Sequence, residues 1–184
     1  MDSALSIALS VALGVGLAAA AGFRVFLPML ALSIAAYTGH LQLHENFAWL
    51  GTASAVATLS VAAVVEVLAY YIPAVDNLLD TITTPMALIA GAVLAAAVIT
   101  DLPPVVRWST AIIAGGGTAA ITQGITTLVR AKSTAFTAGL ANPAVSTFEM
   151  IAAAIMSSLA LLAPLVIFCV LIARLMRRYR AQSR

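Results

Sequence analysis

The chain has 184 residues, of which 62% are hydrophobic and only 9% are charged, with a mean hydropathy of +1.07 and a formal net charge of +2. A water-soluble domain carries charge on roughly a quarter of its residues, so this composition excludes a soluble globular fold. The surroundings should therefore be a lipid bilayer, in which unpaired backbone N–H and C=O groups are costly and the spanning segments must be helical.

Six apolar segments predict the transmembrane helices, and they cover 3–22, 25–38, 48–72, 86–100, 105–128 and 149–173. The predicted fold class is all-α, a polytopic helical transmembrane bundle of about six spans, the shorter of them tilted or incomplete. Five of the nine basic residues lie in the last eleven positions: Arg174, Arg177, Arg178, Arg180 and Arg184. The positive-inside rule places this tail in the cytoplasm, and an even number of spans places the N terminus beside it.

Glu66 is the strongest candidate for a functional residue. If 48–72 forms one helix, Glu66 lies about 9 Å from its Pro73 end. A lone carboxylate at that depth costs at least ~2.5 kcal/mol, so it should face the bundle interior and have a partner such as Arg24 or Arg107. A cation or proton site is one interpretation, and a buried ion pair that only fixes helix packing is the other. Arg24 itself is predicted either to snorkel to the head groups or to form the base of a hairpin.

Asp76 and Asp80 are four residues apart, so they would share one face of a short helix that follows Pro73. Two carboxylates on one face could concentrate cations at a pore mouth. The alternative is a solvated interfacial helix with Asp76 as its N-cap. The pair Thr84-Pro85 would then start the next span, since proline is favoured at the first helical position.

The segment from 105 to 128 carries small residues spaced by four, at Gly116, Ala120 and Gly124. Such a stripe lets helix backbones approach closely, so we predict tight helix packing there. Gln123 and several threonines also make this span polar for its depth. They predict either hydrogen bonds between helices or the wall of a pathway.

The stretch RAKSTAFTAGLANPAVSTFE, residues 130–149, is too polar for a lipid-facing helix and too apolar for an ordinary loop. Non-helical backbone at membrane depth is tolerated only where protein buries it or where it lines a watery cavity. We therefore predict a re-entrant segment over 131–148, broken near Gly139 and Asn142. The alternative is a full crossing, which gives seven spans and moves Arg130 to the cytoplasmic side.

Glu149 also has two interpretations. The run Ser146-Thr147-Phe148-Glu149 matches the capping box, in which Ser146 and Glu149 satisfy backbone N–H groups at the start of a helix. Alternatively, a helix N-terminus beside broken backbone at Asn142, with Arg130 nearby, could bind an anion.

A shift of 83 positions lays Arg24 on Arg107 and Glu66 on Glu149. Three spans in each half is an odd number, so the halves would form an inverted repeat, as in many transporters whose site lies between the repeats. A chance match in an alanine-rich chain is the alternative. The predicted division is a first membrane half (1–85), a second half with the re-entrant segment (86–173) and a basic cytoplasmic tail (174–184).

Three stretches, AGFRVFLPML (21–30), VDNLLDTITTP (75–85) and AGLANPAVSTFE (138–149), together resemble the bacterial membrane-protein family called domain of unknown function 4126. The resemblance covers nearly the whole chain. It implies a small integral protein of the bacterial inner membrane, and it supplies no activity, substrate or site. Ala141 stands where the family pattern has a second glycine after Gly139, which weakens the case for a tight turn there.

These features predict a small transporter or channel for an ion or small polar solute. Its pathway residues would be Glu66, Asp76, Asp80, Asn142, Glu149, Arg24, Arg107 and Arg130. The rival prediction is a non-transporting scaffold or accessory subunit, whose carboxylates are caps and structural pairs. Because the chain shows no catalytic triad, zinc-ligand set or nucleotide motif, we expect no enzyme, cofactor or metal. The expected partners are the lipid bilayer, anionic head groups at the basic tail and further copies of the chain in a homo-oligomer, with no nucleic acid.

Overall fold

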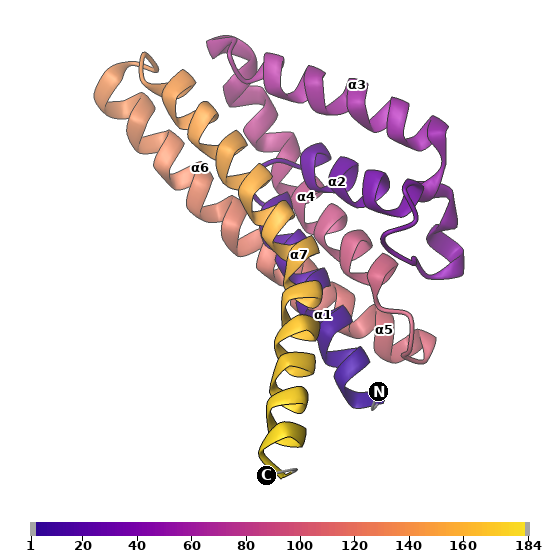
Figure 1. Ribbon diagram of the computed structural model, residues 1–184. Coiled ribbons are helices and arrows are strands. Elements are labelled where there is room, and N and C mark those ends of the chain that lie inside the picture. The colour runs from indigo at the N-terminus through magenta and orange to yellow at the C-terminus, as the bar shows by residue number, and fades with distance from the viewer. Residues whose placement is uncertain (1–2, 183–184) are drawn as a thin grey trace.

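In the computed structural model, helices joined by short connections form one bundle (Figure 1). The structure describes the backbone of residues 3–182 and the side chains of 4–72, 79 and 81–163. The elements in chain order are α1 (Ser3–Ala21), α2 (Phe26–Tyr37), the 3-10 helix η1 (Glu45–Gly51), α3 (Ala53–Ala69), α4 (Pro73–Val98), α5 (Pro104–Thr110), the π-helix η2 (Ala111–Gly116), α6 (Gly117–Thr137) and α7 (Asn142–Gln182). Within residues 3–182 there is no strand, as the all-α prediction requires.

All six predicted apolar segments form helices, but not all are long enough to cross a membrane. Within the described part of the chain, four helical segments are long and apolar enough: Ala4–Ala21, Thr81–Val98, Pro104–Thr137 and Asn142–Ala163. The pair η1 and α3, bent by 68°, makes a fifth if it counts as one span. The 12 residues of α2 rise only about 18 Å against a hydrocarbon layer of about 30 Å. By length and composition the described helices therefore offer four or five candidate crossings, and the predicted count of six is not confirmed.

The predicted helix start at Thr84-Pro85 is wrong. The helix α4 begins at Pro73, so this proline lies in the first turn of the helix. The helix then continues through Pro85 and ends at Val98. Proline at a first turn is favoured because the missing N–H would have no intrahelical partner. A proline inside a membrane helix is tolerated where neighbouring helices and side chains satisfy the freed backbone group. The local signal for a cap followed by proline is thus overridden by the continuous helix.

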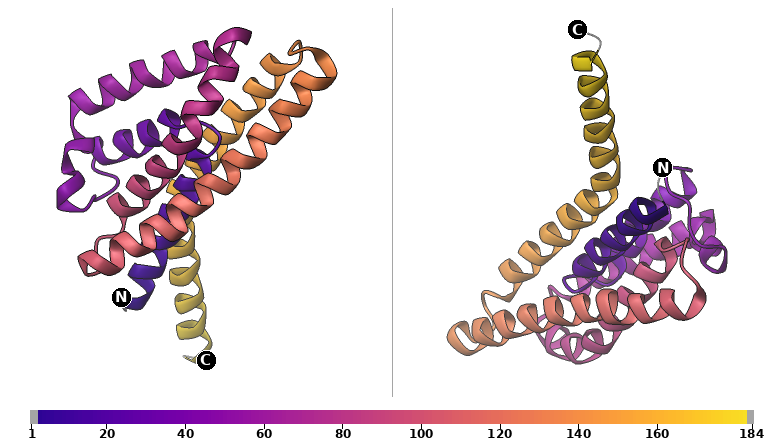
Figure 2. Two further views of the ribbon diagram at one scale, coloured as in Figure 1. Left: turned by 180° about the vertical axis from the view of Figure 1, so that it is seen from behind. Right: turned by 90° about the horizontal axis from the view of Figure 1, so that it is seen from below.

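The N-cap prediction for Asp76 is also wrong, because Ile72 holds that position in α4. The side chains of Asp76 and Asp80 lie outside the described residues, so their predicted role as a cation-attracting entrance stays a prediction. The same holds for the side chains of the basic tail, 174–184. Figures 1 and 2 show the ribbon of the last part of α7 leaving the bundle.

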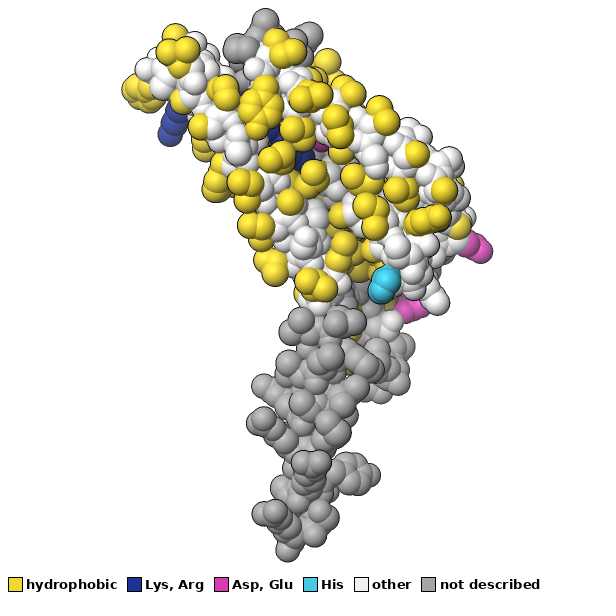
Figure 3. All heavy atoms as spheres, turned by 45° about the horizontal axis from the view of Figure 1, so that its top comes forward, with side chains coloured by type: hydrophobic (Ala, Val, Ile, Leu, Met, Phe, Trp, Pro, Cys, Tyr) yellow, Lys and Arg dark blue, Asp and Glu magenta, His cyan; other side chains and the backbone are white. Residues whose placement is uncertain are grey.

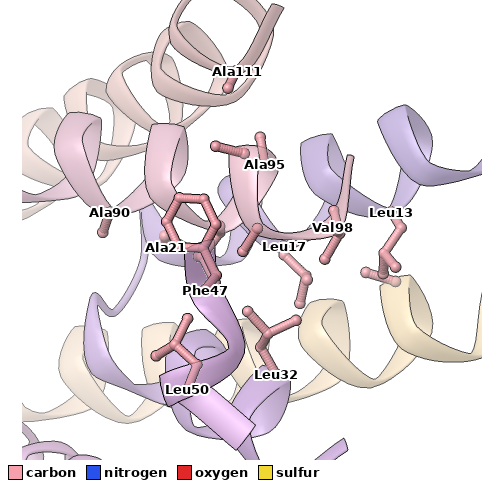
Figure 4. Packing of buried hydrophobic residues seen from close by; sticks show 14 of the residues in the cluster. Leu13, Leu17, Ala21, Leu32, Phe47, Leu50, Ala90, Ala95, Val98 and Ala111 are labelled. Atoms are coloured by element: carbon pink, nitrogen blue, oxygen red, sulfur yellow. The ribbon is translucent and has the colours of Figure 1, made fainter. Parts of the chain in front are cut away.

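The helix α1 is the centre of the bundle and packs against α2, α4, α6 and α7 (Figures 1 and 2). The core consists of hydrophobic side chains, aliphatic except for Phe47, that come mainly from α1, α2, η1 and α4 (Figure 4). Its fully buried members include Leu17 of α1, Leu32 of α2, Leu50 of η1 and Leu94 of α4. Alanines fill the remaining positions on α4, which brings that helix close to α1.

The helix α4 crosses η2 closely at Gly91 and Gly115. A Cβ atom added to Gly91 would stand 2.8 Å from the Gly115 carbonyl oxygen and 2.6 Å from the Ala119 Cβ. Only a residue without a side chain fits there, because real Cβ atoms do not approach backbone so closely. Tight packing of this span is therefore confirmed.

Gly116 of the predicted stripe is buried against Leu88 of α4, but the other small residues of the crossing lie one register position earlier than predicted. Ala111, Gly115 and Ala119 are buried, whereas a Cβ at Gly124 would meet open space. Small residues occur on adjacent registers of this segment, so spacing alone could not say which face meets α4. The π-helical turn from Ala111 to Gly116 adds a second uncertainty, since it changes the phase of the helix locally.

The helices α6 and α7 run antiparallel and are joined by a tight turn at 138–141 (Figure 1). Ala138 and Gly139 have positive φ angles of 50° and 86°, and the Thr137 hydroxyl accepts a hydrogen bond from the Ala141 N–H at 3.1 Å. The predicted break near Gly139 and Asn142 is therefore confirmed, and Ala141 is no obstacle to it. A single helix through 131–148, as a seventh crossing would need, does not form. Re-entry into the membrane stays a prediction.

The shift of 83 residues does not superpose equivalent elements. Arg24 lies in the connection between α1 and α2, whereas Arg107 lies within α5. Glu66 is near the end of α3, whereas Glu149 is near the start of α7. The inverted repeat therefore stays a prediction.

Candidate functional site

Four charged side chains from distant parts of the chain come together inside the bundle. They are Arg24 after α1, Glu66 on α3, Arg130 on α6 and Glu149 on α7. We call these four residues the charged cluster. Their exposed fractions are 1%, 7%, 2% and 2%, so all four are shielded from the surroundings. Buried charges are costly unless they are paired and hydrogen-bonded, so the contacts of each one matter.

Glu149 joins the two arginines. Its Oε2 atom lies 3.3 Å from Arg24 Nη2 and also pairs with Arg130 Nη2. One carboxylate oxygen thus lies between two guanidinium groups that would otherwise repel each other. The capping-box alternative is wrong, because α7 begins at Asn142 and leaves Ser146 and Glu149 inside the helix. The Asn-Pro pair starts the helix earlier than the capping box predicts.

Tyr70 lies against both arginines, and the sequence reasoning missed it. The Arg24 Cζ is 3.8 Å and the Arg130 Cζ is 4.5 Å from the centroid of its ring. These distances define two cation–π contacts on one aromatic side chain. The only signal in the sequence is an aromatic residue near a helix end, which many membrane helices carry at the interface.

A polar network continues from Tyr70 across the bundle. The Tyr70 hydroxyl shares a hydrogen bond of 3.0 Å with Thr83 of α4, and the Gln123 amide donates to the same Thr83 oxygen at 3.2 Å. Gln123 and Thr83 are both buried. The predicted hydrogen bonds between helices on the polar face of α6 are thereby confirmed, and they connect α6 to the charged cluster.

Arg24 uses only part of its guanidinium group. Its Nη2 donates to the Ser146 carbonyl at 3.0 Å and to the Ser146 hydroxyl at 2.5 Å. Its Nε and Nη1 atoms are buried and have no hydrogen-bond partner among the residues that the structure describes. Since buried polar atoms are nearly always hydrogen-bonded, these two nitrogens are an exception that calls for a reason.

Glu66 caps a helix in the structure, and its predicted role as a cation or proton site stays a prediction. Its two carboxylate oxygens accept hydrogen bonds from the backbone N–H groups of Val25 at 2.8 Å and Phe26 at 3.1 Å. These groups belong to the start of α2, which has no side-chain cap of its own. A carboxylate at a helix N-terminus is favoured by the helix dipole. Glu66 therefore caps α2 from another helix, and it binds the backbone beside Arg24 rather than the guanidinium group.

Two further predicted residues lie apart from the charged cluster. Arg107 is buried in α5, which packs against α4 and η2, whereas Arg24 follows the end of α1. Asn142 lies at the turn between α6 and α7, where its amide donates to Thr134 at 3.0 Å. The structure thus brings together Arg24, Glu66, Arg130 and Glu149, but not Arg107 or Asn142.

Two members of the charged cluster lie well inside their helices, whereas Arg24 is in the connection between α1 and α2 and Glu66 is three residues before the end of α3. Arg130 is seven residues before the end of α6 and Glu149 is seven residues after the start of α7, so each is about 10 Å from its helix end. Exposed hydrophobic side chains surround the charged cluster on the outside, among them Leu128, Val129, Phe148 and Ile151. Figure 3 shows the same pattern, with hydrophobic side chains over most of the face and little charge between them.

An apolar helical bundle with spanning helices and internal ion pairs defines a polytopic integral membrane protein. Residues 11–181 match the model of a family described as Domain of unknown function (DUF4126), and the chain belongs to that family. The resemblance read from the sequence is thereby confirmed. No curated protein and no solved structure matches the chain. Among the described residues, no group of three His, Cys, Asp or Glu side chains is placed to hold a metal ion.

Proposed function

We propose that the protein is a small membrane transporter or channel for an ion or small polar solute. Its binding site would be formed by Arg24, Arg130 and Glu149. The observation that supports the proposal is the buried carboxylate of Glu149, about 10 Å from the start of α7, which two buried guanidinium groups share. Ionisable side chains inside membrane helices are expensive and are usually kept for function.

The shared carboxylate suggests how a solute could be admitted. An ion that competes for one partner of Glu149 replaces one ion pair while the other keeps the carboxylate in place. The aromatic ring of Tyr70 stays against both guanidinium groups during such an exchange. The change in energy on binding would thus be small, which suits a site that must also release its ligand.

The setting of the protein is part of the same proposal. The family resemblance and the basic residues of 174–184 favour the bacterial inner membrane with the C terminus in the cytoplasm. Because 184 residues leave little room for an enclosed path, the working form would be a homo-oligomer. The basic tail would bind anionic head groups.

The test is flux in proteoliposomes. Purified protein is reconstituted, and the movement of Na⁺, K⁺, H⁺, chloride and phosphate is measured against protein-free vesicles. We expect Glu149→Gln to lower the flux at least about tenfold, because removing one partner of a buried charge pair leaves the other unpaired. Lys132→Gln is the matched control, since Lys132 is an exposed cation on the same helix as Arg130.

Some outcomes would overturn the proposal. Vesicles that contain folded protein but pass none of these ions faster than protein-free vesicles would remove its support. Glu149→Asp keeps the charge and shortens the side chain, so it guards against a Glu149→Gln variant that fails to fold. A folded Glu149→Gln variant with unchanged flux would show that the charged cluster is not the site.

A scaffold or accessory subunit is the second candidate, and Glu66 favours it. Both of its carboxylate oxygens accept backbone hydrogen bonds that cap α2, which is a structural task. If the whole charged cluster is structural, substitutions at Glu66 and Glu149 should lower the thermal stability, and the wild-type protein should show no flux. Co-purification of a stable partner from native membranes would then support the scaffold.

A further inference from the structure

The unused nitrogens of Arg24 point to the class of ligand. A guanidinium group carries five N–H donors, and it stays charged at any pH a protein tolerates. The Nε and Nη1 atoms of Arg24 together hold three of those donors, and they are buried without partners among the described residues. A ligand with several acceptor oxygens would satisfy them.

The charges around Arg24 favour an anion. Glu149 is shared with Arg130, so its single negative charge serves two cations. Glu66 directs both carboxylate oxygens at the backbone of α2. The two carboxylates offset the two guanidinium charges overall. The N–H groups of Arg24 that have no partner among the described residues still present local positive charge, which attracts an anion and repels a cation. A water molecule could accept hydrogen bonds there but would add no charge.

The Ser146 hydroxyl lies 2.5 Å from Arg24 Nη2, and it can turn its own O–H toward a ligand oxygen. It is buried, as are Arg24 and the nearby Gln123. Charge-assisted hydrogen bonds from a guanidinium to oxyanions are among the strongest in proteins. The site therefore combines a fixed positive charge, free donors and a hydroxyl.

We infer that the Arg24 side of the charged cluster binds a small oxyanion, such as phosphate, sulfate or a carboxylate. The inference rests on the proposed function and names its substrate class. The oxyanion could be a soluble ion or the phosphate of a lipid head group, and both share the chemistry that Arg24 recognises. The ligand would approach Nε and Nη1 while Nη2 keeps its bonds to Ser146.

The test is equilibrium binding to the full chain in detergent, without flux. Sodium phosphate, sodium sulfate and sodium acetate are titrated while thermal unfolding is followed, with sodium chloride at the same ionic strength as the reference. We expect a saturable rise in the melting temperature with the oxyanions. Arg24→Lys keeps the charge but has one nitrogen, so it should weaken binding by about tenfold, the loss expected for one charged hydrogen bond.

Two variants keep the inference falsifiable. Lys132→Gln should leave binding unchanged, since Lys132 is exposed. If Arg24→Lys does not fold, Ser146→Ala removes only the hydroxyl beside Arg24 and should weaken binding about threefold, the lower range for one neutral hydrogen bond. No saturable effect of any oxyanion on the wild type, or an equal effect on Arg24→Lys, would overturn the inference and leave water as the partner of these nitrogens.

The remaining outcomes separate the two proposals. Competition by phosphatidylglycerol but not by soluble phosphate would support the oxyanion site with a lipid as its source. Oxyanion binding without flux would support the site and overturn transport. Flux of a cation without oxyanion binding would support transport and overturn the oxyanion site.

Discussion

Replacement of Glu149 by glutamine is the sharpest test of the charged cluster. The substitution keeps the size of the side chain and removes its charge. In the wild type, Glu149 is 2% exposed and pairs with Arg24 and Arg130, which are equally shielded. Glutamine can still offer one carbonyl oxygen to one guanidinium group, but neither cation keeps a counter-charge in Glu149.

The size of the effect follows from these contacts. Removing one partner of a buried ion pair destabilises a protein by about 3–5 kcal/mol, and the retained carbonyl oxygen places Glu149→Gln near the lower end. For a chain of this length, about 3 kcal/mol corresponds to a fall in melting temperature of roughly 6–12 °C. Thermal unfolding in detergent, followed by tryptophan fluorescence, measures it. Lys132→Gln should change the melting temperature by less than about 1 °C, as surface substitutions do.

A double-mutant cycle identifies the partner. If Glu149 and Arg130 stabilise each other, Arg130→Gln combined with Glu149→Gln should be less destabilising than the sum of the two single changes. The expected coupling is about 1–3 kcal/mol for residues in one network. A Glu149→Gln variant within about 0.5 kcal/mol of wild type, or strictly additive effects, would refute the reasoning that the carboxylate holds two buried cations together.

Three further substitutions test other parts of the structure. Glu66→Ala leaves two backbone N–H groups of α2 without acceptors and should lower the free energy of unfolding by about 2–4 kcal/mol, while Glu66→Gln should lower it less. Amide hydrogen exchange at Val25 and Phe26 should become faster in the alanine variant. Unchanged exchange at these two residues would contradict the cap. Gly91→Ala should push α4 away from η2 and lower the free energy of unfolding by about 1–3 kcal/mol, measured by thermal unfolding. Gly124→Ala adds a methyl group in open space and should be neutral or stabilising. Equal effects of the two substitutions would contradict the close crossing at Gly91. Tyr70→Phe loses the hydrogen bond to Thr83 and should lower the free energy of unfolding by about 0.5–1.5 kcal/mol. Tyr70→Leu should lower it more, because both cation–π contacts are lost as well. Equal stability of the two variants would show that the ring does not stabilise the arginines.

Several features could be read from the sequence because they depend on local composition. The six apolar segments all became helices, and the break near Gly139 was visible as a glycine followed by an asparagine-proline pair. Arg24 and Glu149 stood out as charges in an apolar chain, but the prediction that Arg24 snorkels to the head groups is wrong, because Arg24 is buried inside the bundle. Such signals are local, so no knowledge of neighbouring helices was needed.

Other features were misread because two local patterns competed. Thr84-Pro85 has the pattern of a helix start, yet α4 runs through it. Ser146 and Glu149 have the pattern of a capping box, yet Asn142 starts the helix and turns both side chains to Arg24 and its neighbours. A capping signal states that a helix can begin at a residue, and packing decides whether it does.

The sequence by itself determined the apolar medium and the all-helical class, because both follow from sums over neighbouring residues. Only the tertiary structure decided the partners. Arg24 meets Ser146 across 122 positions of the chain, and Glu66 reaches the start of α2 across about 40. A buried charge must find some partner, since solvation is lost, but which one it finds depends on how the helices cross. These pairings exist only in the folded bundle. They include the contacts of both guanidinium groups with the ring of Tyr70.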